Sequence, residues 1–162
     1  HDGYGDLHYT DQSGRNDILL SRVAVDKKNL YFYAETDKPL TPSTDPHWML
    51  LFINTDQDAT TGWEGYEYVI NNRVLDGSRT TLMRYDAQHG QWVQVAELQY
   101  AVSGNRLEVA VPRKLIGARG RSIALDFKWA DNPRDLRTII SLCTTGDTAP
   151  NRRFAFRFLW KQ

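Results

Sequence analysis

The chain has 162 residues, of which 41% are hydrophobic and 25% charged, and these values fit one globular domain with its own core. Twenty basic residues balance twenty acidic ones, so the net charge gives no reason to expect a nucleic acid or an anionic membrane as partner. No apolar run approaches the roughly 18 residues of a membrane span, and the single cysteine, Cys143, allows no internal disulfide bond.

Short segments rich in β-branched and aromatic residues, separated by turn formers, follow one another along the chain. An extended lead-in is expected over residues 1–14, and because the chain opens on His1 rather than Met, we expect a mature or excised segment. The predicted strands are 18–26, 29–36, 47–55, 66–71, 80–86, 91–98, 106–112, 122–131, 138–143 and 153–160. Segment 112–117 is predicted as a helical turn that ends at Gly117. The pattern predicts an all-β fold over residues 15–162, a single antiparallel β-sandwich with the two-sheet architecture of a jelly roll or immunoglobulin domain.

The stretch INTDQDATTGWEGYEYVIN, residues 53–71, offers oxygen ligands at a spacing near that of a calcium loop. The position that needs glycine in an EF-hand is occupied by Thr61, and the flanking segments predict strands, so an EF-hand is not expected. Two interpretations stay open. Asp56 and Asp58 either hold a calcium ion in a looser site or only cap a hairpin loop.

Catalytic chemistry has little support in the sequence. Glycoside cleavage uses two facing carboxylates, and either Glu64 or Glu67 could pair with Asp126 or Asp131, but no spacing marks one pair. Zinc, nucleophile-elbow and Walker motifs are missing, and the basic clusters 118–122 and 151–154 suggest solvated faces rather than a nucleic-acid site. We therefore predict no catalytic residues, with a small β-sandwich glycoside hydrolase or lyase as an alternative.

Stacking against aromatic rings is the chemistry that the sequence favours. Trp63 lies in a polar loop between two glycines, where we expect an exposed ring that could pack on a sugar. Trp129 is the candidate for a second wall, with Asn132 and Arg134 in the polar loop that follows. The alternative is that Trp63 folds back as a lid on the core.

Three segments carry a family resemblance: QSGRNDILLSRVAVDKKNLYFYAET, WMLLFINTDQDATTGWEGYEYVIN and TTGDTAPNRRFAFRF. Together they resemble family 9 carbohydrate-binding modules and the wider group of DOMON-like sandwiches, from about Gly14 to Phe158. The resemblance implies a non-catalytic accessory domain, typically C-terminal, in an extracellular, cell-surface or periplasmic bacterial glycoside hydrolase or related polysaccharide-utilisation protein. A structural spacer that packs on its catalytic partner without a ligand of its own is the alternative.

The resemblance also implies a polysaccharide or oligosaccharide ligand, an adjacent catalytic domain in the same chain and, in many members, a structural calcium ion. The predicted carbohydrate-binding residues are Trp63, Trp129, Glu67, Asn132 and Arg134, of which only Trp63 has an obvious counterpart in the family. Some DOMON-like domains bind haem through Met and His. No haem is expected here, because the chain has only two methionines and one of them, Met49, lies in a predicted core strand.

Overall fold

The structure is a computed structural model that describes residues 14–162, so the predicted lead-in lies outside the described residues except for Gly14. Over this range the chain forms ten strands, a 3₁₀ turn and a short α-helix. The strands are β1 (Ile18–Val25), β2 (Asn29–Thr36), β3 (Leu50–Asn54), β4 (Tyr68–Val74), β5 (Arg79–Asp86), β6 (Gln91–Ser103), β7 (Arg106–Pro112), β8 (Ser122–Asp131), β9 (Asp147–Ala149) and β10 (Phe156–Lys161). The turn η1 spans Arg113–Ile116, and the helix α1 spans Ile139–Thr145.

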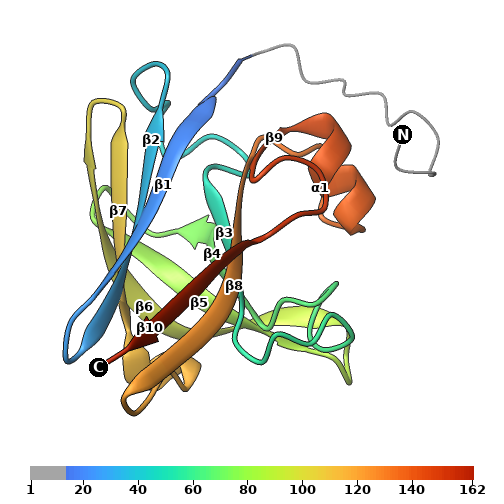
Figure 1. The fold of residues 1–162 in the computed structure, drawn as a ribbon. Helices are drawn as coiled ribbons and strands as arrows, with labels where there is room; N and C mark the ends of the chain where they lie inside the picture. The colour runs from blue at the N-terminus through green and yellow to red at the C-terminus, as the bar shows by residue number, and fades with distance from the viewer. Residues whose placement is uncertain (1–13) are drawn as a thin grey trace.

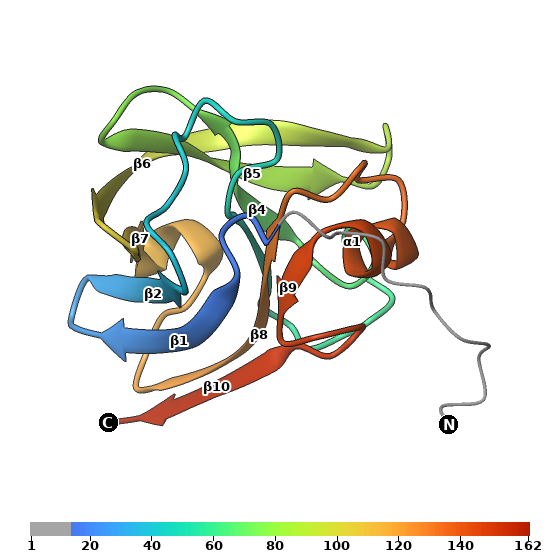
Figure 2. The ribbon, with the colours of Figure 1, turned by 90° about the horizontal axis from the view of Figure 1, so that it is seen from above.

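All strand pairs are antiparallel, and they join into one sheet with the order β1-β2-β7-β6-β5-β4-β3-β8-β10, in which β9 pairs with β8. The predicted all-β, antiparallel fold is therefore confirmed. The two faces expected of a sandwich are opposite walls of this one sheet, which curls into an almost closed barrel (Figure 1, Figure 2).

A seam is left where the two edges of the curled sheet approach each other. Strand β1 forms one edge, and β9 and β10 lie along the other. Side chains bridge the seam: the Ile18 N–H donates to Oδ2 of Asp147 on β9 at 2.8 Å, and Nε1 of Trp129, on the neighbouring strand β8, donates to Oγ of Ser21 at 2.9 Å. Within the described strands no β-ladder crosses the seam, so side-chain contacts alone hold it closed.

Two hydrophobic cores lie on opposite faces of the sheet. The inner core fills the barrel and includes Phe32, Leu51, Ile53, Phe127 and Trp129, whereas the outer core lies on the outside of β3, β4 and β8. Strand β3 contributes to both, because successive residues of a strand face opposite sides, and all five of its residues are buried. The outer core consists of Leu50, Phe52, Trp63, Tyr66, Val69, Ala130 and Leu142.

The helical turn predicted near residue 112 is confirmed as η1, and Gly117 ends it in the left-handed conformation with φ of 69°. The strand predicted over 138–143 is wrong, because these residues begin helix α1. Thr138 caps this helix by accepting a hydrogen bond from the Ser141 N–H at 3.1 Å, and this local contact outweighs the strand propensity of the two isoleucines that follow. None of the helices within residues 14–162 has the length and apolar character needed to cross a membrane.

Candidate functional site

Trp63 lies in a tight hairpin rather than in an open loop. Trp63 and Tyr66 exchange main-chain hydrogen bonds of 2.8 and 2.9 Å across a turn in which Glu64 and Gly65 both have positive φ, 52° and 92°. This turn folds the indole back onto the sheet, where it stacks on Phe52 with 5.2 Å between ring centroids and is only 7% exposed. The expectation of an exposed ring was therefore wrong, and the lid on the core is what the structure shows.

Trp129 is fully buried in the inner core, whereas Trp63 belongs to the outer core. The sheet itself separates the two indoles, so the prediction that they form two walls of one sugar site is wrong. The sequence alone did not predict this separation, because the side of the sheet that each ring occupies depends on strand alternation and on the turn after Gly62.

The polar residues predicted beside the tryptophans are not gathered around an exposed ring. The Asn132 N–H donates to the carbonyl of His47 at 3.0 Å, and the N–H of the exposed Arg134 donates to Oγ1 of Thr145 at 2.8 Å. Glu67 lies in the hairpin loop instead, where its Oε2 accepts hydrogen bonds from the main-chain N–H and the hydroxyl of Thr55, at 2.6 and 3.0 Å. A role of these residues in sugar binding stays a prediction.

Several oxygen atoms converge on the hydroxyl of Thr61. Its Oγ1 lies 3.1 and 3.0 Å from the two carboxylate oxygens of Asp56, 3.0 Å from the Asp58 carbonyl and 2.9 Å from Oε1 of Glu67. A hydroxyl has one hydrogen to donate, so it can satisfy only one of these four acceptors. The Asp58 carboxylate faces Thr60 instead, and the hydrogen bonds from the hydroxyl and N–H of Thr60 lower the pKa of the Asp58 carboxyl.

These oxygens test the calcium prediction. Carboxylate and carbonyl oxygens are the ligands that Ca²⁺ prefers, so the donor set fits an ion held by Asp56, Glu67 and the main-chain carbonyl of Asp58. The Asp58 carboxylate does not join the set. Within residues 14–162 no three His, Cys, Asp or Glu side chains gather closely enough to hold a metal by themselves, and calcium binding stays a prediction.

The carboxylates considered as catalytic partners are already engaged. Asp126 forms a two-pronged ion pair with Arg157, with N–O distances of 2.9 and 3.0 Å. Asp131 is fully buried and accepts hydrogen bonds from Arg15, Asn16 and the main-chain N–H of Met49. Both groups thus have structural partners within the fold.

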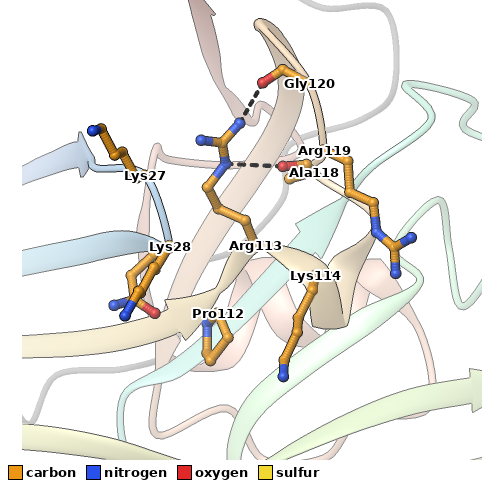
Figure 3. Close-up of a pocket in the computed structure, with 9 residues that line it drawn as sticks. Lys27, Lys28, Pro112, Arg113, Lys114, Ala118, Arg119 and Gly120 are labelled. Atoms are coloured by element: carbon orange, nitrogen blue, oxygen red, sulfur yellow. Dashed lines mark hydrogen bonds between the residues drawn. The ribbon is translucent and has the colours of Figure 1, made fainter.

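A pocket of about 720 Å³ lies at the end of the barrel formed by the β1–β2 hairpin, η1 and the segment before β8 (Figure 3). We call it the basic pocket, because five of its nine lining residues are cationic and none is acidic. Lys27 and Lys28 come from the hairpin, while Lys114 and Arg119 lie on the other side of Arg113 (Figure 3). The complete lining is Lys27, Lys28, Asn29, Pro112, Arg113, Lys114, Ala118, Arg119 and Gly120.

Arg113 is the structural centre of the basic pocket. Its guanidinium donates to the main-chain carbonyls of Ala118 at 3.0 Å, Asp26 at 3.1 Å and Gly120 at 2.6 Å, and it lies 5.2 Å from the ring centroid of Trp160. These contacts tie the β1–β2 hairpin to the segment before β8 without a carboxylate. No pocket cation forms an ion pair with any carboxylate in the described part of the chain, so the positive charge of the pocket is not neutralised by such a pair.

Asp26 is the acidic residue of the β1–β2 hairpin, but it is not part of the pocket lining. Its Oδ1 accepts hydrogen bonds from the N–H groups of Lys28 and Asn29, both at 2.7 Å, and its Oδ2 accepts one from the Tyr31 hydroxyl at 2.9 Å. The main-chain hydrogen bonds, that from Asn29 foremost, lower the pKa of the Asp26 carboxyl, so it stays charged and shapes the turn. It offsets only a small part of the five positive charges.

Sequence reasoning missed the basic pocket because its cations lie in two distant segments. The hairpin lysines are in the turn DKKN, whereas Lys114 and Arg119 come more than 80 residues later. The pairing of β2 with β7, in which Asn29 faces Pro112, brings both segments to the same end of the barrel. Of these cations only Arg119 belongs to a cluster, 118–122, that the sequence suggested as a solvated face, and only the strand pairing could have shown that the two segments share a site.

Comparison of the chain with protein-family models, with curated proteins and with solved structures gives no significant match. The resemblance to family 9 carbohydrate-binding modules therefore stays a prediction from the sequence.

Proposed function

We propose that this chain is a non-catalytic domain that binds an acidic saccharide, with the anionic group of the sugar in the basic pocket. The observation that carries the proposal is the segregation of charge. The net charge of the chain is zero, yet one pocket gathers five cations and no acidic residue. A pocket with one sign of charge concentrates ligands of the opposite sign.

The pocket has the size and chemistry for a small ligand. Its volume of about 720 Å³ lies within the roughly 300–1,000 Å³ of typical ligand sites. Arg113 is fixed by three carbonyls, which leaves Lys27, Lys28, Lys114 and Arg119 to meet a carboxylate or sulfate. A sugar hydroxyl could hydrogen-bond the side chain of Asn29 in the same pocket.

The saccharide class and the non-catalytic role have separate support. The resemblance to carbohydrate-binding modules supports a sugar as ligand, and the ion pairs of Asp126 and Asp131 support a role without catalysis. In this proposal the domain is an accessory part of a secreted or periplasmic bacterial protein that acts on polysaccharides, next to a catalytic domain, as the resemblance implies.

The test is calorimetric titration at low ionic strength with sodium glucuronate as probe and glucose as its neutral counterpart. We expect glucuronate to bind and glucose not to bind. Replacing Lys27 and Lys114 together by alanine should weaken glucuronate binding roughly two- to thirtyfold, since an exposed ion pair contributes roughly 0.2–1 kcal/mol. Lys38→Ala, an exposed lysine beyond the far end of β2, is the matched control and should leave the affinity unchanged.

Two results would disprove the proposal. One is the failure of the wild type to bind glucuronate. The other is equal weakening by the pocket variant and by Lys38→Ala, which would mean that only the overall charge of the protein matters. A shift of affinity with salt alone does not distinguish the pocket, because any exposed cation is screened in the same way.

A further inference from the structure

A row of partly exposed side chains leads away from the basic pocket along the outer face of β2. In this strand Leu30 and Phe32 are buried in the inner core, so Asn29, Tyr31 and Tyr33 face outward. Asn29 lines the basic pocket, and its Nδ2 donates to the hydroxyl oxygen of Tyr31 at 3.2 Å. Outward residues of a strand are about 7 Å apart, so the row extends roughly 13 Å from Asn29 to Tyr33.

Both tyrosines are held in place by their own hairpin. The Tyr31 hydroxyl donates to Asp26 at 2.9 Å, and the Tyr33 hydroxyl donates to Glu35 at 2.7 Å, which raises the pKa of Tyr33. Because each hydroxyl bonds to a residue nearby along the chain, each ring lies along the strand rather than projecting into water. A ligand that stacks on such rings loses little side-chain freedom in binding.

The neighbours of Tyr31 leave its ring accessible. Its partner on β1 is the exposed Ala24, and its partner on β7 is the partly exposed Ala110. A methyl group is too short to cover an aromatic ring from a neighbouring strand. The result is a strip of sheet without bulky side chains beside Tyr31, continuous through Asn29 with the basic pocket. The C–H faces of sugar rings pack on surfaces of this kind.

The charges along the strip differ from those in the pocket. Next to Tyr33 lie Arg22 on β1 and Glu108 on β7, and beyond them Glu35 approaches Arg106 at 3.9 Å. Positive and negative side chains are therefore balanced there. A polymer with an anion at every unit would meet the two glutamates, whereas neutral sugar units would find hydrogen-bonding partners of both kinds.

We propose that the basic pocket and the tyrosine row together bind an acidic hetero-oligosaccharide. One acidic residue lies in the pocket, and the neutral residues that follow it stack on Tyr31 and extend toward Tyr33. This inference rests on the proposed function, because it needs the pocket to accept the acidic sugar. It goes further by giving the ligand a length and a charge pattern.

The experiment compares three probes by calorimetric titration: glucuronate, neutral xylotetraose, and a tetrasaccharide in which glucuronic acid is linked to xylotriose. We expect the acidic tetrasaccharide to bind at least about tenfold more tightly than glucuronate, and xylotetraose to bind most weakly. Tyr31→Ala should weaken tetrasaccharide binding about tenfold, the effect of losing one aromatic contact, and should weaken glucuronate binding much less, because only the tetrasaccharide reaches the ring. Tyr31→Phe keeps the ring and should keep most of the affinity.

A second variant covers the case in which Tyr31→Ala does not fold. Ala24 is exposed, so Ala24→Arg places a long side chain over the strip without removing buried surface, and it should weaken tetrasaccharide binding selectively.

If the tetrasaccharide binds no more tightly than glucuronate, the row is not part of the site, although the pocket proposal stands. If glucuronate does not bind, the proposed function and this inference fail together. Tighter, Tyr31-dependent binding of a short oligothymidylate would show that the ligand is a single-stranded nucleic acid and overturn the inference.

Discussion

The variant Trp63→Ala distinguishes between two roles of Trp63: a buried ring that covers the outer core and an exposed ring that stacks on a sugar. The indole is 7% exposed, stacks on Phe52 at 5.2 Å and lies 6.2 Å from the ring of Trp92. Its removal therefore opens a cavity in the outer core, and we expect a loss of folding stability rather than a specific loss of ligand binding.

The size of the effect follows from burial. Replacing a buried Phe or Trp by alanine costs roughly 3–5 kcal/mol, and the hairpin that carries Trp63 can partly collapse into the space, so we expect about 3 kcal/mol. Domains are stable by roughly 5–15 kcal/mol, and one kcal/mol shifts the melting temperature by about 2–4 °C at this chain length. The melting temperature should fall by about 6–12 °C.

Urea unfolding followed by circular dichroism measures the change in free energy, and differential scanning calorimetry measures the melting temperature. Phe154→Ala is the matched control, because that ring is 71% exposed and its loss should change stability by less than about 0.5 kcal/mol. If Trp63→Ala also costs less than about 1 kcal/mol, the ring is not part of a packed core and the reasoning fails.

Three further predictions follow from the geometry. A Cβ at Gly62, where φ is +60°, would lie 2.2 Å from the Tyr66 carbonyl oxygen, so Gly62→Ala should lower the free energy of unfolding, measured in urea, by about 2 kcal/mol or more. Gly90→Ala is the control: φ there is +63°, but the nearest atom to the new Cβ is 3.8 Å away, so the loss of stability should be clearly smaller. Equal losses of stability in the two variants would contradict the clash. Burial lowers the pKa of Lys128 to about 8, whereas the pKa of a lysine in the unfolded chain is roughly 10.4. Between about pH 8 and roughly pH 10.4 the unfolded state therefore binds more protons than the folded state, so raising the pH over this range increases the contribution of Lys128 to the free energy of unfolding. The free energy of unfolding of the wild type minus that of Lys128→Met should therefore grow from pH 8 to pH 10, whereas a constant difference would refute the shift. Excess chelator should lower the melting temperature of the wild type but not of Asp56→Asn, and an unchanged wild-type midpoint would exclude a tightly bound structural calcium ion.

Strands were predictable where side chains alternate between core and solvent. In β10, Phe156, Phe158 and Trp160 pack against the inner core while Arg157 and Leu159 are exposed, and such alternation is visible in a single sequence. The segment that became α1 was not predictable in the same way. Its isoleucines favour a strand, and the choice of helix over strand depends on one capping hydrogen bond, from the Ser141 N–H to the Thr138 side chain.

The candidate site was harder to predict than the fold, for a physical reason. The fate of Trp63 depends on whether the turn at Glu64 and Gly65 points it toward Phe52 and Trp92, which come from different strands. A Trp in a loop with glycines fits a platform or a lid equally well. Long-range strand pairing decides between them, and it is encoded in no single segment.

Arg113 connects the basic pocket to the seam, the part of the barrel that we expect to open locally most easily. Within the described strands no ladder crosses the seam, so local opening should begin there, and amide hydrogens of β1 and β10 should exchange with deuterium sooner than those of the central strands. The Arg113 guanidinium donates a hydrogen bond to the carbonyl of Asp26, just after β1, and lies against the ring of Trp160 on β10, so it links the two edges at this end of the seam. An anion bound between the hairpin lysines and Arg119 would stabilise the closed seam, so occupancy of the pocket should slow hydrogen exchange along both edges of the barrel.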